Sequence, residues 1–191
     1  MRLGDSAGGH RGPARQGLSG VPADSVQEAS DIQLVLGVEM AAQTRCVSMQ
    51  VDFDVAVPAG VNLRGLTVSG NIEATNVQSD VFATTVSGNI DITTTGIAEA
   101  VAVSGSIDVV VGEADWDQDL AFTAVSGSVV VRVPSNTNAS VTATTISGTV
   151  TTDFPLGGTA RNRSGNIGQG GPRLIMTAVS GNVRLRSGPA A

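Results

Sequence analysis

Seven copies of one short motif run through the chain, each with a Ser-Gly pair followed by a small polar residue and then by Ile or Val. Six copies begin with Val or Ile, and the sixth begins with Arg163. The motif glycines stand 16 to 22 residues apart, and they are Gly70, Gly88, Gly105, Gly127, Gly148, Gly165 and Gly181. A tight turn between strand-forming residues that recurs at a nearly constant period is typical of stacked repeat proteins. We therefore expect consecutive windings of the chain to lie on top of one another.

The residues around each motif favour strands that bury one face. In 107–111 and 129–133, apolar side chains two positions apart alternate with outward positions such as Asp108 and Arg132. Aromatic residues make up only 3% of the chain and tyrosine is absent, which favours a narrow coil filled by aliphatic side chains over a sandwich. The sequence predicts an all-β, single-stranded parallel β-solenoid, right-handed, with about seven coils over residues 61–187.

The turns themselves follow from local chemistry. Only glycine takes a positive φ without a Cβ clash, and it lets successive turns approach closely. The small polar residues after the glycines are predicted to form a column that hydrogen-bonds along the stack. These residues are Asn71, Asn89, Ser106, Ser128, Thr149, Asn166 and Asn182. The two longest glycine intervals predict protruding loops at 112–119 and 134–140.

The segments before the repeats differ from them in composition. Residues 1–30 are rich in Gly, Arg and Ser and have no apolar period, so they are predicted to be a disordered tail. Residues 31–60 contain two apolar stretches, and the second alternates through 51–57 until Pro58 ends it. We expect this segment to form a small antiparallel β lid over the first coil.

The chain offers little for catalysis. Its single histidine, His10, lies in the predicted tail, so a serine or cysteine nucleophile in the repeats would have no imidazole beside it. The motif serines are interpreted as turn formers. Four carboxylates, Glu113, Asp115, Asp117 and Asp119, suggest calcium, but Leu120 and Ser126 stand where an EF-hand loop needs Gly and Glu. We predict no catalytic, cofactor-binding or metal-binding residues, and a solvated loop at the four acids.

Charge is divided unevenly along the chain. Residues 31–160 carry fourteen acids and three arginines, whereas residues 161–191 carry five arginines and no acid. These are Arg161, Arg163, Arg173, Arg184 and Arg186, and we predict that they contact an anionic surface polymer or the acidic flank of a neighbouring copy. A simple solvated terminal coil is the alternative. The net charge of −6 disfavours nucleic acid as a partner.

Three features together resemble the bacterial toast-rack or adhesin β-strand-repeat family over about residues 31–187. They are the alternating strand that ends at Val57-Pro58, the serial Val-Ser-Gly-Asn-Ile motifs, and 131–134 followed by a fresh strand into Ile146-Ser147-Gly148. The resemblance implies a parallel β-solenoid at the bacterial cell envelope, in a family with some members in envelope-stress systems. Many relatives carry an export signal or a membrane anchor, and this sequence shows neither an apolar signal core nor an apolar run of about 18–20 residues.

Three hypotheses for function follow. The first is a non-enzymatic structural or interaction protein that presents its flat faces or basic end to an envelope protein. The second is a scaffold that assembles end to end through its acidic-to-basic polarity. The third is a polysaccharide-acting enzyme built on a β-helix. A cytoplasmic location remains open because no signal peptide is present in the sequence.

Overall fold

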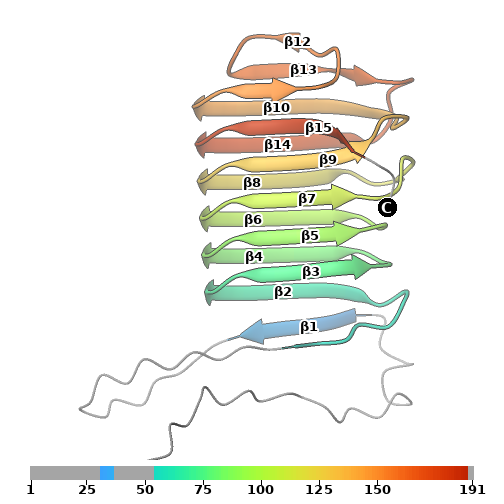
Figure 1. Cartoon of the computed structure of the whole chain (residues 1–191), viewed down its shortest axis with the longest axis vertical. Helices are drawn as coiled ribbons and strands as arrows, with labels where there is room; N and C mark the ends of the chain where they lie inside the picture. The colour runs from blue at the N-terminus through green and yellow to red at the C-terminus, as the bar shows by residue number, and fades with distance from the viewer. Residues whose placement is uncertain (1–30, 37–53, 189–191) are drawn as a thin grey trace, which may run out of the picture. The chain divides into compact units, whose positions relative to one another are not determined.

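The computed structural model describes residues 31–36 and 54–188. Within them, six of the seven Ser-Gly motifs form turns that join two strands in different sheets (Figure 1). Sheet A has nine strands in the order β1 (Asp31–Leu36), β2 (Asn62–Ser69), β4 (Val81–Ser87), β6 (Ala98–Ser104), β8 (Leu120–Ser126), β14 (Arg173–Ser180), β10 (Ala139–Ser147), β13 (Asn162–Ile167) and β12 (Gly157–Gly158). Sheet B has six in the order β11 (Val150–Thr152), β15 (Val183–Gly188), β9 (Val129–Pro134), β7 (Ile107–Val111), β5 (Ile90–Thr94) and β3 (Ile72–Val77). All fifteen belong to one unit formed by residues 29–38 and 57–191.

The core lies between the two sheets and follows the predicted period of two. In β8, Leu120, Phe122 and Ala124 are fully buried while the residues between them face outward. Because the strands pair in parallel and in register, each inward side chain stacks on its equivalent in the next winding. Phe122, the largest fully buried side chain, is flanked by Ala100 on one side and Met176 on the other. The aliphatic solenoid predicted from composition is confirmed.

The glycine file at the corner is also confirmed for six of the seven motif glycines. Their φ angles lie between +146° and +152°, a region that is almost exclusive to glycine. A Cβ on Gly127 would overlap the carbonyl oxygen of Gly105, and a Cβ on Gly181 would overlap that of Gly127. The amide of Gly127 donates to the carbonyl of Ser180 at 2.9 Å. The turns therefore stack backbone on backbone, and no side chain fits between them.

The polar column forms with six of its seven predicted members. The seventh, Asn166, lies in β13 opposite Ser140. The Asn71 Oδ1 accepts the amide of Asn89 at 2.8 Å, and the Asn89 Oδ1 accepts the amide of Ser106 at 2.9 Å. The ladder continues through Ser128 to Asn182, whose Oδ1 accepts both the amide and the hydroxyl of Thr149. Each side chain thus satisfies a backbone donor one winding further along the stack.

The order of the last windings differs from the prediction. The windings up to β8–β9 stack in chain order, but β14–β15 lies between β8–β9 and β10–β11. After β9 the chain skips one layer and forms β10 and β11 in the layer beyond it. The skipped layer is occupied by β14 and β15, which come later in the sequence. The sequence predicts a protruding loop at 134–140, but Pro134 ends β9 and Ala139 begins β10, so the connection is residues 135–138. Instead of protruding, it spans the skipped layer, with Thr137 buried and its amide donating to the Pro134 carbonyl at 3.2 Å.

The sixth motif does not form a winding. Its residues, Arg163 to Ile167, lie in β13, which pairs antiparallel with β10, and Gly165 faces Val141 instead of joining the glycine file. The predicted place of Gly165 among the turn glycines is therefore wrong. The preceding segment explains this, because Pro155, Gly157 and Gly158 replace the alternating strand that leads into the other motifs. The described residues hold six windings, with β12 and β13 at the β10 edge.

The lid prediction is partly corrected. The strand β1 pairs in parallel with β2, from Asp31 opposite Asn62 to Leu36 opposite Thr67, so it extends sheet A and is not an antiparallel cover. Residues 51–53 of the second lid stretch, the predicted tail with His10, and residues 37–50 lie outside the described residues. Residues 54–57 are described and form no strand, so this part of the lid prediction is wrong. The predicted 112–119 loop is present between β7 and β8, and its Trp116 packs against the core. The handedness of the solenoid stays a prediction.

Candidate interaction surfaces

The five arginines predicted as interaction residues occupy three separate places. Arg184 and Arg186 lie two residues apart on β15 and are exposed on the outer face of sheet B. Arg161 and Arg163 lie at the start of β13, at the far end of sheet A. Arg173 begins β14 at the edge where the strands start. The structure therefore brings together one pair of arginines on each sheet, and not one basic end.

Arg173 is engaged by the loop that precedes β8. Its amide donates to the Oδ1 of Asp119 at 2.8 Å, and its Nε donates to the Oδ2 at 2.9 Å. The backbone and side-chain hydrogen bonds from Arg173 hold the pKa of the Asp119 carboxyl below its ordinary value. Because Leu174 is opposite Leu120, this clamp fixes the first residue of the inserted strand beside β8. Its role is structural.

Arg163 also has a structural contact. One guanidinium nitrogen, Nη1, donates to the carbonyl of Leu156 at 3.3 Å, which ties β13 to the segment before β12. Arg161 is exposed, while its carbonyl accepts the amide of Thr145 at 2.8 Å. Among the predicted arginines, Arg161, Arg163, Arg184 and Arg186 have no ion pair among the described residues.

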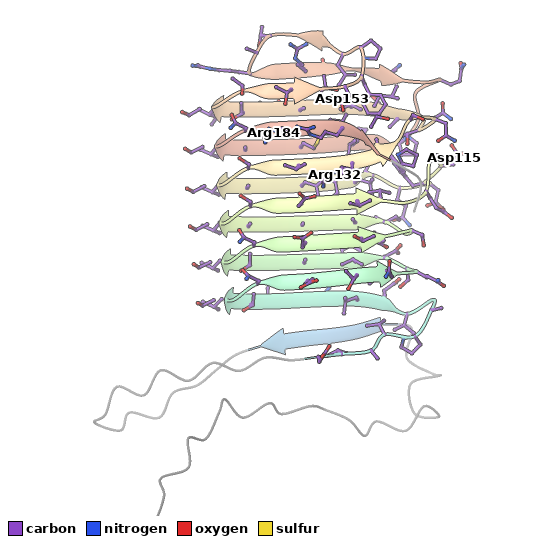
Figure 2. All side chains as sticks on the ribbon, viewed as in Figure 1. Asp115, Arg132, Asp153 and Arg184 are labelled. Atoms are coloured by element: carbon purple, nitrogen blue, oxygen red, sulfur yellow. The ribbon has the colours of Figure 1, made fainter. Side chains whose placement is uncertain are left out.

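The outer face of sheet B carries opposite charges on its two halves. Glu73 on β3, Asp91 on β5 and Asp108 on β7 are register partners in one file. Arg132 on β9 is the register partner of Arg186 on β15, and Arg184 precedes that residue by two. These six residues form what we call the charged face: Glu73, Asp91, Asp108, Arg132, Arg184 and Arg186. Figure 2 labels Arg132 and Arg184 on these neighbouring strands.

One ion pair joins the two halves of the charged face. Asp108 and Arg132, on adjacent strands, form a salt bridge with each side chain a little over one third exposed. Glu73 and Asp91 on one side, and Arg184 and Arg186 on the other, are exposed. Like charges that face each other on adjacent strands destabilise a sheet. The charged face therefore holds unneutralised acids at one end and unneutralised arginines at the other.

The outer face of sheet A is almost uncharged. At the last outward position before each stacked turn stands Val or Ile, and these six side chains are 38% to 67% exposed. We call them the aliphatic file: Val68, Val86, Val103, Val125, Val179 and Ile146. The neighbouring outward file contains Leu66, Thr84, Val101, Thr123, Thr177 and Thr144. Such a continuous apolar surface is of the kind that marks an interaction site.

Sequence reasoning missed the aliphatic file, although a signal was present. The residues before these valines are small or hydroxylic, as in Thr85-Val86 and Ala124-Val125, and those are the ones that face the core. Counting two residues back from the motif valine reaches Thr84 and Thr123, which also face outward. Strict alternation from the buried Phe122 and Ala124 places Val125 outside.

Two charged residues of sheet A, Arg64 and Glu99, lie near each other over β2, β4 and β6. The guanidinium of Arg64 lies 5.3 Å from the ring centroid of Phe82, a cation–π distance. These two residues, with Leu66, Glu99 and Val101, line a shallow depression over β2, β4 and β6.

Residues 31–36 and 54–188 contain no cluster of three or more side chains that could hold a metal ion. They also contain no helix that is long and apolar enough to span a membrane.

The family follows from the comparison of the sequence with family models. The model described as Toastrack DUF4097 matches residues 59–186, which are the windings together with β12 and β13. The chain belongs to the Toastrack family. It is a family of unknown function, so membership establishes the β-solenoid and leaves the activity open. Searches of the curated proteins and of the solved structures found no match.

Proposed function

We propose that this Toastrack protein is a non-enzymatic interaction protein of the cell envelope, and that sheet A is the face on which an envelope protein docks. The single observation that supports this is the aliphatic file and the threonine-rich file beside it. Across β4, β8, β14 and β10 the outward residues before the turn read Thr-x-Val or Thr-x-Ile. Their side chains form a regular apolar and hydroxyl surface with no charge.

The chemistry of this face favours a protein over an anionic polymer as the partner. Binding of a polyanion needs several cations on one surface, and the two charged residues outward on β2, β4 and β6 are Arg64 and Glu99, one of each sign. Protein interfaces are built around an apolar centre with a polar rim. On sheet A, the aliphatic file supplies an apolar surface and the depression at Arg64 supplies polar groups beside it. The envelope location rests on the family resemblance.

The experiment compares two single lysine substitutions. Val125→Lys places a charge in the middle of the aliphatic file, whereas Thr151→Lys places one on an exposed outward position of β11 in sheet B. The proteins are immobilised, envelope proteins of the native host are passed over them, and any retained protein is purified and titrated. We expect Val125→Lys to weaken that binding about tenfold or more, because a charge would be buried without a partner, and Thr151→Lys to leave it unchanged.

Two results would contradict the proposal. Equal affinity of both variants would exclude sheet A as the docking face. Binding to anionic vesicles alone, abolished by Gln at Arg161, Arg184 and Arg186 together, would favour the anionic surface that the sequence first suggested. Melting curves of each variant show that the fold is retained, since both substitutions are at outward positions.

A further inference from the structure

We infer that the charged face on sheet B is the interface of a two-fold dimer of this chain. This inference does not rest on the proposed function, because it uses the opposite sheet and a different partner. It starts from the unneutralised charges of the face. Three acids in register on β3, β5 and β7 repel one another, as do Arg132 and Arg186 in register on β9 and β15.

A two-fold axis brings the two charged halves together. An axis parallel to the strands, lying between β7 and β9, places β7 of one copy over β9 of the other and β5 over β15. Asp91 then faces Arg184 of the second copy, because both belong to the same outward file of sheet B. With strands about 4.8 Å apart, both residues lie about 7 Å from the axis. Each contact occurs twice because the axis repeats it.

The centre of this arrangement combines apolar and charged side chains. Val110 on β7 and Val130 on β9 face outward and are half-buried next to the Asp108–Arg132 ion pair. Because Asp108 and Arg132 are on the same two strands, all four side chains would lie nearest to the axis in both copies. Glu73 would face the neutral Thr151 of the second copy, which is the register partner of Arg184. The face thus combines two central valines and an ion pair within each copy with one complementary contact between copies, Asp91 to Arg184, which occurs twice.

A second copy fits this face better than the other candidate partners. An anionic polymer that contacted Arg184 would lie on a strip that continues into Asp108, Asp91 and Glu73. Growth end to end is hindered at the last edge of sheet A, because β13 pairs antiparallel with β10 there and the two-residue β12 follows. An isologous contact closes at two copies, whereas end-to-end growth does not.

The size of the face predicts a weak dimer. Six strands with about five residues each cover about 30 Å by 16 Å. Two such faces together bury on the order of 900 Å², which is below the standard size for stable complexes. Electrostatic attraction between exposed charges is screened by salt. We therefore expect dimerisation that rises with protein concentration and weakens as salt is added.

The experiment is sedimentation of the full chain and of two single charge-reversal variants of it, Asp91→Arg and Arg184→Asp. Each reversal alone places like charges opposite each other twice, so we expect each to weaken dimerisation at least tenfold. An equimolar mixture of the two single variants is expected to restore the dimer, because every contact across the axis then joins opposite charges. The double variant is expected to dimerise for the same reason. Thr151→Lys is expected to strengthen the dimer, because the lysine would face Glu73 of the second copy.

Four outcomes would overturn the inference: a monomer at high protein concentration and low salt, oligomers that grow beyond two, a dimer that both single reversals leave intact, and loss of the dimer without recovery in the mixture. Circular dichroism melts of each variant exclude unfolding as the cause, since both positions are exposed. None of these results bears on envelope binding by sheet A, so failure of the dimer and failure of the proposed function are distinguishable.

Discussion

The first four windings and the last two are built with the same turn, but the first four stack in the order of the chain and the last two do not. From β2 to β9 each winding stacks on the one before it, whereas β14–β15 enters between β8–β9 and β10–β11. Yet the corner is the same in both regions: the glycine file runs from Gly127 through Gly181 to Gly148 without a break. The turn motif therefore specifies how a winding is built and leaves open which winding comes next.

The difference between the regions lies in the segments between windings. The connection after β9 crosses a whole layer, and the segment after β11 turns back through β12 and β13 before it reaches β14. Contacts of long sequence separation then hold the inserted strand, above all the clamp between Arg173 and Asp119. Order in a solenoid is thus decided by connections and edge contacts once all windings are equivalent.

The largest effect is expected from adding a methyl group to the glycine file. If the inserted layer is packed as tightly as the sequential ones, Gly181→Ala and Gly105→Ala should cost the same. Both positions have a strained φ and face a carbonyl oxygen, so we expect each to lower the free energy of unfolding by roughly 2–6 kcal/mol. Chemical denaturation measures this.

The matched control for the glycine file is Gly70→Ala. Gly70 has a φ of +148°, and among the described residues a Cβ there would meet the Thr67 hydroxyl at 3.5 Å and no carbonyl oxygen. It therefore tests the strain without the overlap, and the expected cost is roughly 1–3 kcal/mol. If Gly70→Ala costs as much as Gly181→Ala, close stacking is not what requires glycine.

A smaller effect is expected from the connection that crosses the inserted layer. Asn138 donates to the Oδ1 of Asp115 at 3.3 Å and accepts the amide of Gln169 at 2.9 Å, so it joins three connections. We expect Asn138→Ala to lower the free energy of unfolding by roughly 1–2 kcal/mol, because two hydrogen bonds are lost. The effect should be concentrated in faster hydrogen exchange of β14.

Asn71→Ala is the sequential counterpart of Asn138→Ala. It removes the one hydrogen bond to the Asn89 amide at the far end of the stack. Its expected cost is about half that of Asn138→Ala, with no change in the exchange of β14. Equal effects of the two variants on β14 would show that the connection does not hold the inserted layer.

The smallest effect is a pH dependence at the Arg173 clamp. The pKa of Asp119 is lowered by the hydrogen bonds from Arg173, so the ionised carboxylate binds fewer protons in the folded state than in the unfolded one. The stability it contributes is present above the ordinary aspartate pKa and is lost as the pH falls through the lowered pKa. The stability difference between the native protein and Asp119→Asn should therefore shrink on acidification.

Asp117→Asn is the control for this pH effect, since it lies in the same loop, is exposed, and has no ion pair among the described residues. Its stability difference from the native protein should not follow the same acid transition. An unchanged difference for Asp119→Asn across that transition would contradict the clamp. The effect should also be reduced by salt, because both partners are partly exposed.

Much of the architecture could be predicted from local pattern. The alternation in 107–111 and 129–133 fixes which side chains face the core, and the Ser-Gly motif requires a corner where only glycine fits. The interaction surfaces were less accessible. The five arginines are close in sequence, but sequence proximity does not determine the sheet, and the structure divides them between sheet A and sheet B.

The amino-acid sequence alone determined the winding: two short strands, a glycine corner, a column of small polar residues and an aliphatic core. These features depend on neighbours within a few residues, where sterics and alternation act. Only the tertiary structure decided that Gly181 lies between Gly127 and Gly148, that Gly165 belongs to an antiparallel strand, and that acids and arginines share one face of sheet B. The reason is physical. Equivalent windings offer one another nearly the same surface, so the order of layers depends on long-range contacts that no single motif encodes.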